Sequence, residues 1–244
     1  MRRPSPKRWS ATEDQLDVQA LHRVREQLVS RRTSVINQIR AFLLERGISF
    51  AKGPASLRRQ MPEILENADE KLTARMRRLL DFLCQEWKHL QLQIESLSED
   101  LEQIASSDEA CIRLQRIPGV GPLVATAVVS AIGNGAAFKK GREFSAWLGL
   151  VPGQWSTGGK TKLLGISKRG NPYLRKMFIH GARAVVLRAK RESTYLGQWM
   201  KSLEGRAARN VVIVATANRL ARISWAVLSS GENYHPMPAL AVAS

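Results

Sequence analysis

The chain has 244 residues, of which 44% are hydrophobic and 24% are charged, which is typical of a globular protein and excludes a disordered one. Its formal net charge of +17 predicts a polyanionic partner, most simply nucleic acid. No apolar run approaches the roughly 20 residues that cross a bilayer, and no apolar stretch follows the basic start MRRPSPKRWS. We therefore expect no membrane partner and no secretory signal.

The two cysteines, Cys84 and Cys111, lie far apart in the sequence and have neither the CxxC spacing nor the histidine pair of a zinc site. They are typical of free thiols in a reducing cytoplasm. We expect a cytoplasmic protein without a zinc site.

The sequence divides into a basic tail (residues 1–11), a helical region (12–105) and a C-terminal domain (106–244). A first long helix is expected from Glu13 to Gly47, because its apolar residues recur at steps of three, four or seven. These residues are Leu21, Val24, Leu28, Val35 and Phe42.

A second long helix is expected from Pro62, a favourable first-turn residue, to about residue 105. From Leu90 to Ile104 its apolar residues follow a four-three-four-three step, the pattern of a coiled coil. Such a helix requires a partner along its length. An antiparallel hairpin with the first helix and a homo-oligomer would both satisfy it.

The C-terminal domain begins with a helix, a tight turn and another helix, and the turn IPGVGP (117–122) resembles that of a helix-hairpin-helix. In that motif the backbone N–H groups around two glycines, here Gly119 and Gly121, hold a DNA phosphate. An ordinary turn between core helices is the alternative. Further helices are expected over 141–150, from Asn171 onward and over 210–228, with room for a small hairpin at 160–166. The predicted fold class is mostly α.

Residues 139–191 are strongly basic, with thirteen Lys and Arg residues against the single carboxylate of Glu143. A solvated protein face normally mixes signs, since like charges repel. We expect a nucleic-acid surface here, formed by residues that include Lys160, Lys162, Lys168, Arg169, Arg175 and Lys176.

The segment GQWSTGGKT (153–161) is close to a nucleotide-binding loop, but Gly153 stands one residue too early and no buried strand precedes it. An ATP site is therefore not expected. What remains is a hydroxyl, Ser156, beside glycines and cations. Lys160, Lys168 and Arg169 could offset phosphate charge if Ser156 attacks phosphorus, although no histidine close in sequence could act as base. From spacing alone, a catalytic serine and a plain polar turn both remain open.

Three segments, IPGVGPLVATAVVSAIG, FSAWLGLVPGQWSTGGKTKLLGISKRGNPYLRK and HGARAVV, together resemble the C-terminal transposase domain of the IS-one-ten insertion-sequence family. The resemblance covers roughly Ser106 to Tyr234. Upstream, QALHRVREQLVSRRTSVINQIRAFLLERGI resembles the coiled-coil region of that family.

The resemblance implies a bacterial, nucleoid-associated DNA transposase or recombinase that a structured guide RNA directs. In that family a RuvC-like domain supplies four acidic Mg²⁺ ligands, and the C-terminal domain supplies a serine that becomes covalently linked to DNA. By motif position the serine is Ser156, with Thr157 as the alternative.

The chain departs from the family pattern at its start, because Met1 lies near the point where the acidic domain should end. We therefore expect a truncated transposase that binds no cofactor itself, whereas the full-length family enzyme uses Mg²⁺. The alternatives are a non-catalytic fragment that binds nucleic acid and dimerises, and a basic ribonucleoprotein component.

Overall fold

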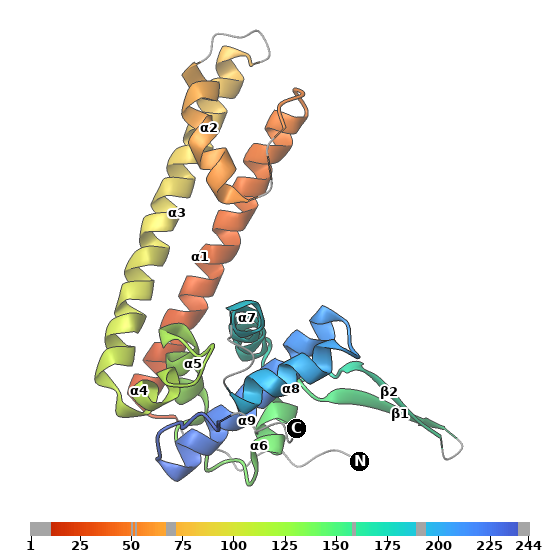
Figure 1. The fold of residues 1–244 in the computed structure, drawn as a ribbon. Coiled ribbons are helices and arrows are strands. Elements are labelled where there is room, and N and C mark those ends of the chain that lie inside the picture. Colours follow the sequence, from red (N-terminus) through yellow and green to blue (C-terminus); the bar gives the residue numbers. More distant parts are fainter. Residues whose placement is uncertain are drawn as a thin grey trace. The chain divides into compact units, whose positions relative to one another are not determined.

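A computed structural model describes residues 11–49, 51, 53–66, 72–157, 160–188 and 194–238, with only the backbone described for Thr157 and Lys160 to Leu163. Within these residues, nine helices and two strands confirm the mostly α class (Figure 1). In chain order they are α1 Glu13–Leu44, α2 Pro54–Glu66, α3 Ala74–Ser107, α4 Glu109–Gln115, α5 Pro122–Ile132, α6 Gly141–Trp147, β1 Pro152–Thr157, β2 Lys160–Ile166, α7 Pro172–Arg188, α8 Tyr195–Glu204 and α9 Arg209–Ser230.

The chain forms two compact units. One is Ala20–Asp100, and the other joins residues up to Gln19 with those from Leu101 onward. The start of α1 thus belongs to the second unit. There the Gln19 side-chain Nε2 donates to the Ser130 carbonyl of α5 at 2.6 Å.

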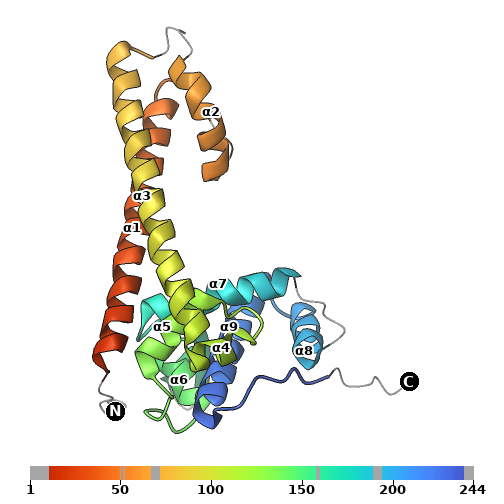
Figure 2. The same cartoon turned by 90° about the vertical axis from the view of Figure 1, so that its left-hand side faces the viewer.

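In the unit Ala20–Asp100, α1 and α3 lie side by side in both views (Figures 1 and 2). Arg25 donates to the Ser98 hydroxyl and Arg32 donates to Gln91, both at 2.8 Å. From the first of these pairs to the second, the residue number increases by seven on α1 and decreases by seven on α3. The two helices therefore run antiparallel. Their facing side chains form a hydrophobic cluster that includes Val35, Ile39, Leu43, Leu80, Leu83, Trp87 and Leu90.

Helix α2 corrects the predicted start of the second long helix. Pro62 lies inside α2, whereas α3 begins only at Ala74, after Thr73, whose hydroxyl accepts from the Met76 N–H at 3.2 Å. The helix α2 exists because Leu57 and Met61, four residues apart, both reach the hydrophobic cluster. Burial of this face therefore outweighs the backbone hydrogen bond that Pro62 removes.

The second unit has its own core, built from α4 to α9. Seven of the eleven residues of α5 are buried, and Phe144 of α6, Phe178 of α7 and Leu220 of α9 are each no more than 1% exposed. Helix α8, which the sequence analysis did not predict, closes this core with Leu196 and Met200. The Thr194 hydroxyl starts α8 by accepting from the Gly197 N–H at 3.1 Å.

Helix α9 corrects the statement that no apolar run approaches membrane-spanning length. Its 22 residues are long and apolar enough by length and composition to cross a bilayer. Nine of them, however, are buried in the core of the unit, among them Val212, Ala217 and Leu228. A core helix passes the same test of composition, and the packing of α9 accounts for its hydropathy.

Candidate functional site

Strands β1 and β2 form an antiparallel hairpin that projects from the body of its unit (Figure 1). Ser156 pairs with Thr161 and Trp155 with Lys162, and the register shifts between Pro152 and Gln154. A nucleotide-binding loop requires a strand that passes through a glycine loop into a helix. The described residues here continue from β1 to a second strand, which agrees with the rejection of an ATP site.

Ser156 is exposed on this hairpin, on the same face of β1 as Gln154, two residues earlier. The Gln154 amide Nε2 donates to the Ser156 Oγ at 2.9 Å. The hydroxyl therefore accepts from Gln154 and keeps its own proton to donate. A neutral amide cannot take up that proton, so Gln154 orients the hydroxyl without activating it. His180, which the sequence left as a distant base candidate, lies exposed on α7.

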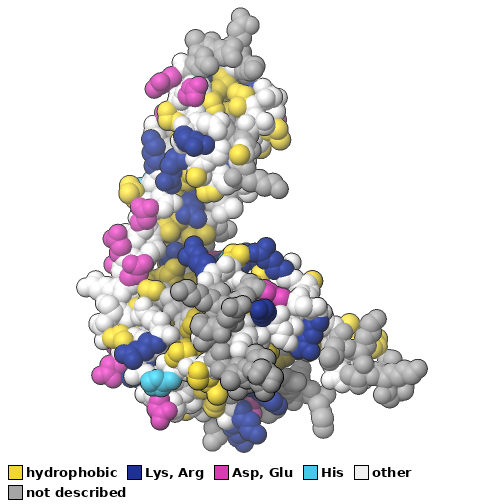
Figure 3. All heavy atoms as spheres, viewed as in Figure 1, with side chains coloured by type: hydrophobic (Ala, Val, Ile, Leu, Met, Phe, Trp, Pro, Cys, Tyr) yellow, Lys and Arg dark blue, Asp and Glu magenta, His cyan; other side chains and the backbone are white. Residues whose placement is uncertain are grey.

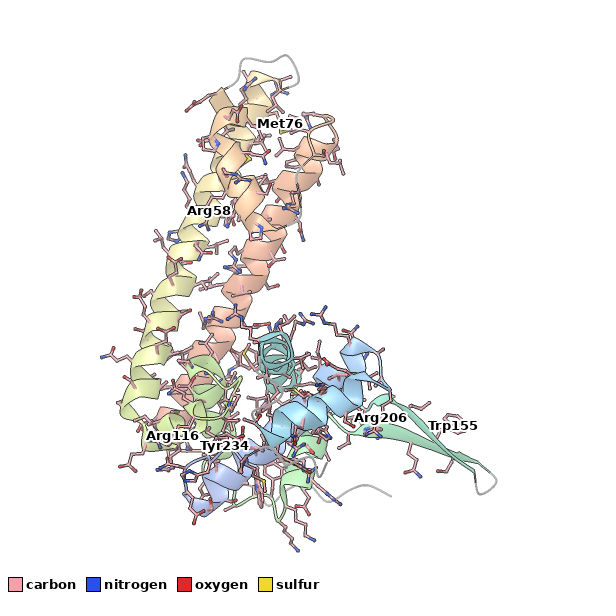
Figure 4. The ribbon with its side chains drawn as sticks, viewed as in Figure 1. Arg58, Met76, Arg116, Trp155, Arg206 and Tyr234 are labelled. Atoms are coloured by element: carbon pink, nitrogen blue, oxygen red, sulfur yellow. The ribbon has the colours of Figure 1, made fainter. Side chains whose placement is uncertain are left out.

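Trp155 lies on the opposite face of β1 from Ser156, because successive side chains of a strand alternate. It is 61% exposed, an unusual position for an indole, and lies on the hairpin away from α8 and α9 (Figure 4). The sequence could not distinguish a core tryptophan from an exposed one here. The structure places it at the surface, where its ring is accessible for stacking.

The root of the hairpin is fixed tightly to the end of α6. The Ser167 N–H donates to the Val151 carbonyl and the Lys168 N–H to that of Gly149. A Cβ on Gly170 would lie 1.7 Å from the Trp147 carbonyl oxygen, so only glycine fits there. Lys168 has a left-handed φ of 54°, which a close backbone network has to hold.

The predicted nucleic-acid residues near this root have different surroundings. Lys168 and Arg169 are exposed, whereas Arg175 donates from Nη1 to the Leu148 carbonyl at 2.9 Å and so helps to fix α6 to α7. The Lys176 ammonium lies 5.5 Å from the centre of the Tyr173 ring. The side chains of Lys160, Lys162 and Thr157 lie outside the described residues.

The two glycines of the turn between α4 and α5 have different roles. Gly119 has a φ of 81°, and a Cβ on it would lie 2.7 Å from the Gly181 carbonyl oxygen of α7. The turn is thus packed directly against α7 at this point. Gly121, the residue before α5, is exposed, and a Cβ on it would have no atom within 4 Å. Of the two, Gly121 has an open side that a phosphate could approach.

Figure 3 shows Lys and Arg side chains on both units, among them the helices around α7, and Asp and Glu side chains along α3 and elsewhere. Among the described residues, Arg183 and Arg188 of α7 are also exposed. The described exposed cations of residues 139–191 thus lie on the second unit, and their part in binding nucleic acid stays a prediction.

A second group of basic and aromatic residues was missed by the sequence analysis. Arg219 of α9 lies over the rings of Tyr195 and Trp199 of α8, at 4.9 and 4.7 Å from their centres. Arg222 lies one turn further along α9 and is exposed. The available signal was the three-residue spacing of Arg219 and Arg222 in a largely apolar helix, which places both on one face.

Comparison with known proteins relates the residues around this hairpin to a family of transposases. Residues 111–196 match the model described as Transposase IS116/IS110/IS902 family. The chain is 43% identical, over 91% of its length, to the transposase for insertion sequence element IS1111A of Coxiella burnetii. It is 41% identical, over 90% of its length, to the transposase for insertion sequence element IS1328 of Yersinia enterocolitica.

The chain belongs to the IS116/IS110/IS902 transposase family. It spans 61% of the length of the IS1111A protein and 65% of the IS1328 protein. The residues that match the IS116/IS110/IS902 model include the glycine turn, the hairpin with Ser156, and α7. Helix α9, which carries Arg219 and Arg222, lies beyond the matched residues.

Full-length members of the IS116/IS110/IS902 family are expected to use Mg²⁺, which binds to oxygen ligands such as carboxylates. Within the part of the chain that the structure describes, no group of three or more His, Cys, Asp or Glu side chains could hold a metal ion. Those residues therefore do not fit an Mg²⁺ ion.

Proposed function

We propose that this chain binds DNA and provides Ser156 as the nucleophile for strand transfer by an insertion-sequence transposase. The observation that carries the proposal is an exposed serine hydroxyl on a projecting hairpin, within residues that match the transposase family. The exposed cations Lys168 and Arg169 follow the hairpin directly and offset the charge of an approaching phosphate.

The proposed step is an exchange of one phosphate ester for another. The Ser156 Oγ bonds to a backbone phosphorus, the bond from phosphorus to one sugar oxygen breaks, and that oxygen leaves as a hydroxyl. The serine proton is lost and the leaving oxygen gains one, so the reaction needs a base and an acid. Gln154 positions Oγ through its 2.9 Å hydrogen bond, and the base comes from outside the hairpin.

We further propose that the turn between α4 and α5 binds a DNA phosphate at the exposed Gly121, in the manner of a helix-hairpin-helix. Gly121 is exposed, has no atom within 4 Å of its Cβ position and caps the start of α5, where the positive end of the helix dipole favours a phosphate. Such a contact reads no base sequence, so target choice would come from a structured guide RNA, a second proposed partner. The chain itself is proposed to bind no cofactor, and the Mg²⁺ expected of the full-length enzyme is assigned to other residues.

A homo-oligomer through the long helices is also part of the proposal. On α3, the apolar side chains of Leu79, Phe82 and Leu92 are 44%, 66% and 65% exposed, so α1 leaves them uncovered. A second copy would bury them. Light scattering of the purified protein should give more than one chain per particle. A single chain per particle at micromolar concentration would contradict this part of the proposal.

The serine role is tested by trapping the covalent product. The purified protein is incubated with DNA from the ends of the insertion sequence that encodes it, digested with nuclease and then with trypsin. Mass spectrometry should find a nucleotide on the peptide Glu143–Lys160, and fragmentation should place it on Ser156 rather than Thr157. Ser156→Ala should abolish the adduct and Thr157→Ala should retain it. An adduct of equal yield in Ser156→Ala would refute the assignment.

The alternative function is a non-catalytic module that binds nucleic acid and dimerises. It is favoured because the Ser156 hydroxyl accepts from a neutral amide, and because no group of three or more His, Cys, Asp or Glu among the described residues could hold a metal ion. The same experiment separates the two functions. Salt-dependent DNA binding without any adduct on peptide 143–160 would establish the alternative.

A further inference from the structure

The second unit contains a large open groove along α9, which we call the α9 groove. Its volume is about 1340 Å³, larger than the roughly 300–1,000 Å³ of small-molecule sites. Helix α9 forms its floor, and α6, α8 and the root of the hairpin form its walls. A site of this size suits an extended ligand better than a small molecule.

Four cations line the α9 groove, and no carboxylate does so among the described residues. They are Lys140 and Arg142 at the start of α6, and Arg219 and Arg222 on α9. A Cβ on Gly141 would lie 3.1 Å from the Arg222 carbonyl oxygen, so the start of α6 is packed against α9. This contact brings the two pairs of cations to one groove. None of the four forms a salt bridge within the described part of the chain, so their charge is available to a polyanion.

The walls of the α9 groove also carry aromatic rings. Tyr195 and Trp199 of α8 are half-buried and face Arg219 of α9. On the other side, the Trp225 Nε1 donates to the Gly135 carbonyl at 3.1 Å, which fixes that ring against the core. Arg219 lies over both α8 rings, and its planar guanidinium offers a face on which a base can stack.

Most of the exposed surface that lines the α9 groove is apolar. This property favours a single strand over a duplex as the ligand of the groove. A duplex presents its phosphates outward and keeps its bases stacked inside, so it gains nothing from an apolar floor such as Val211 and Val214. An unpaired strand presents both phosphates and the faces of its bases. Known single-strand sites combine a positively charged groove with aromatic platforms, as this groove does.

We propose that the α9 groove binds an unpaired nucleic-acid strand, DNA or RNA. Its phosphates lie at Lys140, Arg142 and Arg222, and a base stacks on the Arg219 guanidinium beside Tyr195 and Trp199. The proposal deepens and rests on the proposed nucleic-acid function, but it does not depend on Ser156. It assigns a role to α8 and α9, which lie mostly or entirely beyond residues 111–196 of the family match.

Binding is measured by fluorescence anisotropy with labelled oligo-dT and oligo-U of about 12 nucleotides, within the roughly 4–16 nucleotides of known single-strand sites. Arg222→Glu should weaken both several-fold and reduce the salt dependence by about 0.7 in the slope of log K against log salt. The matched control is Arg78→Glu, an exposed arginine of the unit Ala20–Asp100, with the same change in net charge. Equal weakening by both variants would mean non-specific charge attraction and would overturn the proposal.

The position of the strand is measured by photo-crosslinking with 5-bromouracil in the same oligonucleotides. Adducts are expected on Tyr195 or Trp199, and Trp199→Leu, which keeps an apolar side chain, should weaken binding about ten-fold by loss of stacking. Crosslinks confined to Trp155, or displacement of the strand by an equal concentration of blunt duplex, would overturn the proposal. So would a dimer in light scattering that dissociates in Arg222→Glu, because a second copy would then fill the groove.

The test of the α9 groove and the test of Ser156 can fail independently of each other. Single-strand binding that persists when no Ser156 adduct forms would support the groove and remove the nucleophile. An adduct at Ser156 with no groove crosslink would do the reverse. A preference for oligo-U over oligo-dT would support the proposal and identify RNA as its source.

Discussion

The contact between Gly119 and Gly181 gives the most direct test of the fold around the candidate site. A Cβ on Gly181 would lie 2.0 Å from the Gly119 carbonyl oxygen, a backbone atom with no flexible end to move. To reach the 3.4 Å of ordinary contact, the turn and α7 would have to separate by about 1.4 Å. That shift would open space around Val185, which is 6% exposed.

The magnitude follows from two opposing effects. Alanine in place of a helical glycine favours the helix by about 1 kcal/mol. Forcing apart a closely packed core costs about 1–3 kcal/mol, and more when a backbone atom is hit. Gly181→Ala should therefore lower the free energy of unfolding by about 1–2 kcal/mol. For a unit of this size that corresponds to a decrease in Tm of about 2–8 °C.

The assay is thermal and urea unfolding, followed by circular dichroism, with Gly205→Ala as the control. Gly205 has a φ of −67°, and the nearest atom to its Cβ position is 3.8 Å away, so alanine fits. This control should be neutral or slightly stabilising. If Gly181→Ala is as stable as Gly205→Ala, the turn does not touch α7 as described.

Three further predictions concern titratable groups and a helix cap. Burial, and to a smaller extent the nearby Arg25, lower the pKa of His22 to about 4. The folded state therefore binds fewer protons than the unfolded state at mildly acidic pH. The protein should lose up to about 3 kcal/mol of stability as the pH falls from about 6.5 to about 4. The loss should be smaller in His22→Gln and unchanged in the exposed-histidine control His89→Gln, as measured by urea unfolding at each pH. Burial raises the pKa of the thiols of Cys84 and Cys111, so both should react with a disulfide reagent at pH 8 only after denaturation, and a rapid reaction in native buffer would contradict their burial. Asp108→Ala should cost about 1 kcal/mol in unfolding free energy, because the Asp108 carboxylate accepts from the Cys111 N–H at 2.7 Å, and an unchanged urea midpoint would show that this cap is dispensable.

The sequence predicted the start of α1 and the helices α5, α6, α7 and α9 well, because their periodicity and their proline and glycine boundaries are local signals. It placed the start of the second long helix at Pro62, since a proline is more often at the first turn of a helix than inside one. The packing of Leu57 and Met61 against the cluster decided otherwise. The residues that flank α2 in the sequence carry no signal of this tertiary burial.

For the candidate site, the sequence identified Ser156 through the family resemblance, and its role stays a prediction. It gave no sign of the Gln154 hydrogen bond, which depends on both residues lying on one face of a strand. It grouped Arg175 with the nucleic-acid residues by charge alone. In the structure this side chain donates a hydrogen bond to the Leu148 carbonyl. It missed the α9 groove because Arg219 and the α8 rings come together only in the folded unit.

The β1–β2 hairpin has a consequence for how mutations would appear in a living cell. Its backbone neighbours are mainly its own two strands, whereas the turn at Gly119 is enclosed by α7. A change at Ser156 or Trp155 would leave the amount of protein unchanged and remove only what the hairpin does. A change at Gly119 or Gly181 would instead raise the unfolded fraction that proteases degrade. A genetic screen that measures the abundance of the protein and the mobility of the insertion sequence separately would divide these positions into two classes. Such a screen needs no knowledge of the structure.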